Sequence, residues 1–124
     1  MPSLHIYIPG DQPVQSRTAF LEAATQAVVD SLATPLASVR IMLHEVAAAH
    51  VMVGGRIGVP AVACHVNLIA GRTDAQKAAL FRALTRAAQS CLNVSGEEVR
   101  VILHDIPATD MGMANGASAK SLGR

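Results

Sequence analysis

The sequence repeats itself at a spacing of 60 residues, and this duplication limits the possible folds more than any other feature. At that spacing the segment ASVRIMLHEV (residues 37–46) aligns with EEVRVILHDI (residues 97–106), and His5 aligns with His65. Further identities, such as Leu32 with Leu92, occur at the same spacing without gaps. Matches of this kind indicate that one structural unit has been duplicated.

The first copy has the pattern of a strand, a helix and a second strand. Apolar residues alternate with other residues from Leu4 to Ile8, which is typical of a half-buried strand. A helix is expected from about Pro13 to Leu32, and Pro35 prevents it from continuing. Its apolar face is formed by Phe20, Ala24, Val28 and Leu32. Residues 39–46 are then expected to form the second strand.

The second copy follows the same order. Residues 62–69 are expected to form a strand, and Gly71 marks the turn that follows it. Thr73 is suited to cap a helix that runs to about Leu92. Residues 99–106 are expected to form the closing strand.

These patterns predict an α/β (α+β) fold in a single domain, residues 1–124, made of two βαβ repeats at residues 2–58 and 59–124. A one-helix crossover favours parallel pairing of the two strands within each repeat. The two repeats together predict a four-stranded sheet with two helices on one face. We expect the other face to be apolar and to be covered by further copies of the chain in a closed ring.

Composition and charge exclude several classes of function. The net charge is +1, and no basic run is interleaved with aromatic residues, so we expect no nucleic acid partner. No signal peptide and no apolar run of about 20 residues is present, so we expect a soluble cytoplasmic protein that does not bind a membrane. The two cysteines, Cys64 and Cys91, are expected to be reduced thiols. The histidines lack the spacing of a metal site.

Several motifs, in the right order, resemble one known family. Pro2 follows the initiator methionine and precedes a strand, and the segment GRTDAQK at residues 71–77 matches a GR-[ST]-x-x-Q-K helix entry. The SVRV strand motif occurs as SVRI at residues 38–41 and as EVRV at residues 98–101. Glycine-containing segments follow both strands, at residues 50–55 and 110–116. The chain therefore resembles the tautomerase superfamily, specifically the fused form of 4-oxalocrotonate tautomerase.

The resemblance implies a tautomerase-like fold and an isomerase without a cofactor or metal. Fused members of the family form homotrimers of βαβ pairs, with active sites between neighbouring repeats. Their substrates are small dienol or 2-keto carboxylates of the 2-hydroxymuconate or phenylenolpyruvate type, in which one proton is moved. The resemblance leaves the physiological substrate, its pathway and the symmetry of the trimer open.

Pro2 is the expected catalytic base. The nitrogen of an N-terminal proline is a secondary amine, whereas the nitrogen of an internal proline is an amide without useful basicity. The residue that aligns with Pro2 in the second repeat is Val62, so we expect one catalytic amine per chain. This role requires removal of Met1. Neighbouring arginines are expected to lower the pKa of the amine toward ambient pH.

Three arginines are the expected catalytic partners of Pro2. Arg72 occupies the family position that holds a substrate carboxylate, where the first repeat has Gln12. Arg40 and Arg100 occupy the strand position that binds a carboxylate or the developing oxyanion, and a guanidinium group suits both tasks. The sequence does not decide whether Arg40 or Arg100 completes a given site.

Three alternatives remain open at the level of sequence. Dehalogenase or hydratase relatives need a carboxylate in the last hairpin, where this chain has Met113. Decarboxylase relatives use an acid near the first Val-Arg pair, where Ala37 and Ser38 stand. A trimeric scaffold without catalytic activity is the third alternative. The missing carboxylates favour proton transfer alone.

Overall fold

The computed structural model describes residues 2–124. Its main elements are the strands β1 (Ser3–Pro9), β2 (Arg40–Val46), β5 (Val62–Ile69) and β6 (Val99–Ile106) and the helices α1 (Val14–Leu32) and α2 (Asp74–Leu92). Two short strands, β3 (Met52–Val53) and β4 (Arg56–Ile57), form a separate hairpin. Short 3₁₀ turns join these elements. The expected order of strand, helix and strand in each repeat is confirmed.

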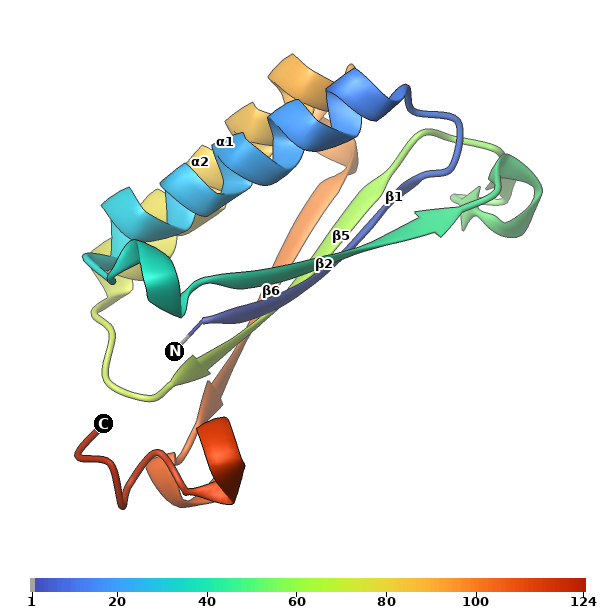
Figure 1. Cartoon of the computed structure of the whole chain (residues 1–124). Helices are drawn as coiled ribbons and strands as arrows, with labels where there is room; N and C mark the ends of the chain where they lie inside the picture. The colour runs from blue at the N-terminus through green and yellow to red at the C-terminus, as the bar shows by residue number, and fades with distance from the viewer. Residues whose placement is uncertain (1) are drawn as a thin grey trace.

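The four long strands form one mixed sheet in the order β2-β1-β5-β6 (Figure 1). Each repeat contributes one parallel pair, and the two repeats meet through the antiparallel pair of β1 and β5 at the centre. In this central pair Ser3 lies opposite Asn67, and His5 lies opposite His65. The beginning of each central strand therefore lies beside the end of the other.

Both helices cover the same face of the sheet, as expected (Figure 1). The predicted apolar face of α1 is buried, and Leu80 and Leu84 of α2 pack into the same core. The strands contribute alternate residues such as Leu4, Ile6 and Ile8 to this core. Removal of this apolar surface from water is the main force that holds the two repeats together.

The two helices begin in different ways. Thr73 caps α2 through a full capping box, in which its side chain accepts from the Gln76 N–H at 3.1 Å while the Gln76 side chain accepts from the Thr73 N–H at 3.0 Å. The predicted cap is thus confirmed. The α1 helix begins at Val14 after Pro13 and has no side-chain cap. Gly71, two residues before the Thr73 cap, has φ of +131°, a backbone region in which a side chain would be strained.

The second face of the sheet differs from the expectation of an apolar surface. The residues that alternate with the core positions point to this open face, and most of them are polar or aromatic. They are Ser3, His5, Tyr7, Arg40, Met42, His44, Ala63, His65, Asn67, Arg100, Ile102 and His104. The expectation was wrong because only Met42, Ile102 and Ala63 are apolar there.

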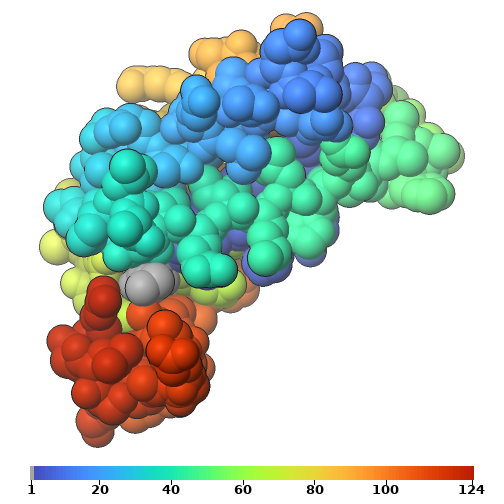
Figure 2. Space-filling view, in the orientation of Figure 1, coloured from blue at the N-terminus to red at the C-terminus, as the bar shows by residue number. Residues whose placement is uncertain are grey.

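Two loop segments stand at opposite ends of the molecule. The β3–β4 hairpin follows β2, and the C-terminal segment after β6 forms 3₁₀ turns and one isolated bridge between Gly112 and Ser118. Figure 2 shows the C-terminal segment, in red, at the end farthest from the hairpin, in green. Within residues 2–124, none of the helices is long and apolar enough to cross a membrane.

Candidate active site

A cavity of about 520 Å³ lies at the beginning of β1, and we call it the β1 cavity. It is lined by Ser3, Arg40, Asn67, Ile106, Met111, Gly112, Met113 and Ala114. The first repeat supplies Ser3 and Arg40 through its two paired strands, and the second repeat supplies the rest. The cavity is therefore built between the repeats, as the antiparallel pairing of β1 with β5 requires.

A second cavity of about 260 Å³ lies at the beginning of β5, and we call it the β5 cavity. It is lined by Tyr7, Ile8, Val46, Val51, Val53, Ala61, Val62, Ala63, Glu98 and Arg100. A shift of 60 residues relates six of these positions to the lining of the β1 cavity. The corresponding pairs are Ser3 and Ala63, Arg40 and Arg100, Asn67 and Tyr7, Ile106 and Val46, Met111 and Val51, and Met113 and Val53. The duplication has thus produced two cavities with different linings.

Pro2 lies immediately before β1, at the edge of the β1 cavity. Its side chain is buried, and its carbonyl accepts a hydrogen bond from the Arg40 N–H at 3.1 Å. The corresponding position in the β5 cavity is the buried Val62. Removal of Met1, on which a basic Pro2 nitrogen depends, concerns a residue outside the described range of the chain.

Arg72 lies in the loop between β5 and α2, at the same end of the sheet as Pro2. Its Nη1 donates to the Ile69 carbonyl at 3.4 Å, and the side chain is half-buried. The register that pairs Ser3 with Asn67 puts Pro2, one residue earlier, beside Leu68. Arg72 is therefore tied to the strand segment that adjoins Pro2.

Arg40 and Arg100 line different cavities, and their guanidinium groups have different partners. Arg100 donates to the backbone carbonyls of Glu97 and Val99, the latter at 3.3 Å. Arg40 makes no side-chain hydrogen bond to any of residues 2–124. All its guanidinium donors are thus available to a ligand in the β1 cavity.

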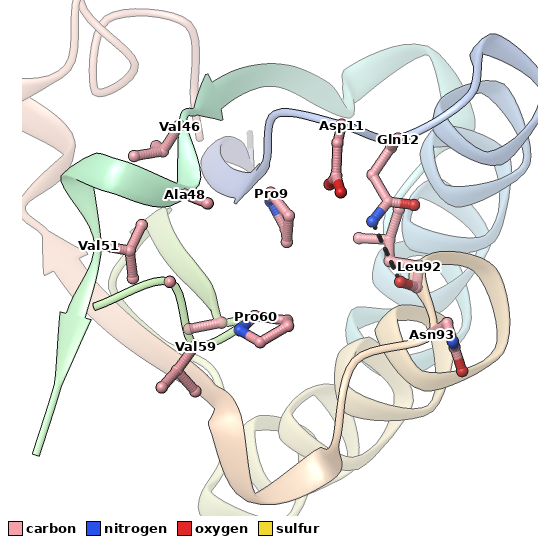
Figure 3. Close-up of a pocket in the computed structure, with 12 residues that line it drawn as sticks. Pro9, Asp11, Gln12, Val46, Ala48, Val51, Val59, Pro60, Leu92 and Asn93 are labelled. Carbon is pink, nitrogen blue, oxygen red and sulfur yellow. Dashed lines mark hydrogen bonds between the residues drawn. The ribbon is translucent and has the colours of Figure 1, made fainter. Parts of the chain in front are cut away.

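A third cavity, of about 300 Å³, adjoins the β5 cavity and contains Gln12 (Figure 3). The two cavities share Val46, Val51 and Ala61. Gln12, which aligns with Arg72, donates from its amide to the Leu92 carbonyl at 3.2 Å. Asp11 lies beside Gln12 on the same wall, so this end of the molecule carries a carboxylate where the other end carries Gly71 next to an arginine.

The remaining titratable groups do not form a second cluster of catalytic type. On the open face His5 Nδ1 lies 2.8 Å from His44 Nε2, and the His65 and His104 rings stack at 5.8 Å. Among residues 2–124, no group of three or more His, Cys, Asp or Glu side chains is arranged to hold a metal. Burial raises the pKa of the Cys64 thiol to about 12, so this thiol stays protonated at neutral pH.

Comparison with known proteins identifies the family of the chain. The family model described as tautomerase enzyme matches twice, at residues 2–58 and 63–119. The chain belongs to the tautomerase family. A 2-hydroxymuconate tautomerase of Comamonas testosteroni is 39% identical over 59 residues, which cover 48% of this tautomerase and 92% of that relative. The relatives named as enzymes support an isomerase of the tautomerase class.

Solved structures extend the similarity to the whole chain. A fused 4-OT wild-type symmetric trimer is 49% identical to this tautomerase, with a TM-score of 0.94 and 98% of each chain covered. The protein Pt0534, inactivated by 2-oxo-3-pentynoate, is 38% identical, with a TM-score of 0.95 and coverage of 98% of this chain and 99% of that one. The resemblance to fused 4-oxalocrotonate tautomerases and the expected fold class are both confirmed.

Sequence reasoning about this tautomerase missed three polar residues of the cavities. Asn67 lines the β1 cavity, Glu98 lines the β5 cavity, and Asp11 lines the cavity beside it. The alternation within residues 62–69 already assigned Asn67 to the open face. The positions of Glu98 and Asp11 depend on how the repeats pair, which the local pattern does not contain.

Proposed function

We propose that the protein is a cofactor-independent tautomerase whose active site is the β1 cavity, with Pro2, after removal of Met1, as the base. The observation that carries the proposal is the difference between the two repeat-related cavities. The β1 cavity adjoins a buried proline at the start of the chain and contains an arginine without protein partners, whereas the β5 cavity has Val62 and an arginine bonded to the backbone.

In the proposed reaction the Pro2 nitrogen accepts the proton of the 2-hydroxyl group of a dienol carboxylate. The electrons of the O–H bond form the 2-keto group, and the conjugated double bonds shift toward the distal carbon. That carbon then takes a proton from the Pro2 ammonium group, which regenerates the free amine. The substrate is isomerised without gain or loss of atoms, so neither an oxidant nor a metal is needed for the proton balance.

The arginines are assigned to the two negative charges of this reaction. Arg72 binds the substrate carboxylate, which a planar guanidinium group can hold with two hydrogen bonds. Arg40 stabilises the charge that develops on the 2-oxygen, because its donors face the cavity without competing protein acceptors. Arg100 is assigned no step in this cavity, since it lines the β5 cavity.

The composition of the cavity favours proton transfer over hydration. The described residues that line the β1 cavity include no Asp and no Glu. Activation of a water molecule needs a general base besides the proline, and a carboxylate is the usual choice. A malonate semialdehyde decarboxylase has the same fold, with a TM-score of 0.83, but at 23% identity it supports the fold alone.

We also propose that the protein acts as a homotrimer. The open face of the sheet carries exposed Met42, Ile102 and Tyr7 among its histidines, and burial of these side chains would stabilise an assembly. Fused relatives have been solved as trimers. Sedimentation equilibrium should give about 39 kDa, which corresponds to three copies of the 12.9-kDa chain.

The activity is tested by the ketonisation of 2-hydroxymuconate and of phenylenolpyruvate, followed by ultraviolet absorbance. We expect turnover by the wild-type protein, a loss of at least about 10²-fold in kcat for Pro2→Ala, and a higher KM for Arg72→Ala. Removal of Met1 is checked in the same sample by mass spectrometry. Equal rates for the wild type and Pro2→Ala would exclude the proline mechanism and favour a scaffold.

A further inference from the structure

The β5 cavity has lost the features that suit the β1 cavity to an anionic substrate, yet it remains open. Val62 replaces the proline, and Gln12 replaces Arg72 in the adjoining cavity. Most of its remaining wall is aliphatic, contributed by Ile8, Val46, Val51, Val53, Ala61, Val62 and Ala63. With a volume of about 260 Å³, it retains space for a small ligand.

The charges around the β5 cavity disfavour a carboxylate ligand. Glu98 lines this cavity together with Arg100, so the one cation is offset by one anion. The residue that aligns with Glu98 in the first repeat is Ser38, which is neutral. Arg100 is already bonded to two backbone carbonyls, and Asp11 adds a second carboxylate in the adjoining cavity. An anion placed here would meet more negative than positive charge that is free to respond.

The polar groups at the rim fit an uncharged ligand with one hydroxyl. Tyr7 is 38% exposed, and its ring is held by stacking on His44 at 4.5 Å between ring centroids and by an edge contact with His65 at 5.9 Å. A phenol hydroxyl can donate or accept a hydrogen bond, and so can the tyrosine side chain. The aliphatic wall would hold the apolar body of the same ligand.

We propose that the β5 cavity is a second ligand site, selective for an uncharged aromatic molecule of about the size of a phenol. It differs from the β1 cavity, which takes carboxylates under the proposed function. The selectivity comes from Glu98, Asp11 and the backbone-bonded Arg100. This inference concerns binding and does not depend on whether Pro2 is catalytic.

The test uses two probes with the same ring and different charge, 4-fluorophenol and 4-fluorobenzoate, at pH 7 with the full-length protein. Binding is followed by ¹⁹F NMR titration. Ala63→Leu fills the β5 cavity, and Ser3→Leu places the same side chain at the matched position of the β1 cavity. We expect Ala63→Leu to weaken 4-fluorophenol binding at least tenfold and to leave 4-fluorobenzoate binding within twofold. Ser3→Leu should have the reverse effect.

A charge variant provides an independent test in case one of the leucine variants does not fold. Glu98→Gln removes the carboxylate from a half-exposed side chain and leaves the cavity otherwise unchanged. We expect the wild-type protein to bind one 4-fluorobenzoate per chain and Glu98→Gln to bind a second. The proposal is overturned if 4-fluorophenol does not bind at millimolar concentration, if Ser3→Leu rather than Ala63→Leu abolishes its binding, or if Glu98→Gln binds no additional carboxylate.

Discussion

The two strand arginines provide the sharpest comparison between the cavities, because they occupy matched positions and differ in their partners. Arg100 donates to two backbone carbonyls, whereas no described residue accepts a hydrogen bond from the Arg40 side chain. Replacement of Arg40 by alanine therefore removes donors that only the substrate would use. Replacement of Arg100 removes a contact with an exposed loop in the other cavity.

The magnitude follows from the number of charged hydrogen bonds at stake. Each hydrogen bond to a charged group contributes about 1.5–3 kcal/mol, so loss of one or two such bonds in the transition state costs roughly 3–4 kcal/mol. At about 1.4 kcal/mol per factor of ten, we expect Arg40→Ala to lower kcat/KM by roughly 10²–10³-fold. For Arg100→Ala we expect less than about threefold, since water can replace its exposed contacts.

The assay is the ketonisation of 2-hydroxymuconate, measured with both variants at the same protein concentration. Arg40→Lys is the control for charge, because it keeps the cation and removes the planar donor pair, and it should lie between the wild type and Arg40→Ala. If Arg100→Ala loses as much activity as Arg40→Ala, the site is completed by Arg100 of a second chain. That result would refute the assignment of Arg40 to its own cavity.

Three further predictions concern stability and reactivity. Phe20→Ala should destabilise the fold by about 3–5 kcal/mol in urea unfolding, because the ring is fully buried, while Phe81→Ala, 39% exposed, should cost far less; similar losses would contradict the assigned core. Thr73→Ala removes the cap of α2 and should cost about 1 kcal/mol, measured as a lower Tm, and an unchanged Tm would show that the cap is dispensable. The pKa of Cys64 is raised from 9.0 to about 12 in the folded chain, so stability should fall as the pH rises from 9 toward 12, where the unfolded thiol ionises first. At pH 8 a thiol reagent should label Cys91 faster than Cys64 in the native protein and both equally in urea, whereas rapid native labelling of Cys64 would argue against its burial.

The local patterns of the sequence predicted most of the fold. Residues 62–69 and 99–106 form strands with the predicted bounds, and Thr73 caps its helix as predicted. The second strand of the first repeat begins at Arg40, one residue later than predicted. These features depend on alternation, helical spacing and capping, all of which act within a few residues along the chain.

The arrangement of the site depends on contacts that no local pattern encodes. The antiparallel pairing of β1 with β5 brings Ser3 beside Asn67 and so decides that Arg40, not Arg100, lines the cavity next to Pro2. The open face was expected to be apolar because the alternation was interpreted only for its buried positions. His5 and Tyr7 were already visible in the same alternation.

The central claim is that the Pro2 nitrogen is a free and nucleophilic amine beside the β1 cavity. The direct measurement is mass spectrometry of the protein and its N-terminal peptide after treatment with 2-oxo-3-pentynoate, the compound that inactivates Pt0534. Addition of the amine across the alkyne forms one N–C bond and moves one proton to carbon, so the chain should gain the mass of one reagent molecule. We predict this gain on Pro2 of a chain that lacks Met1, with loss of activity in proportion to labelling. An active protein that retains Met1, or an inactivated protein labelled only at another residue, would contradict the account.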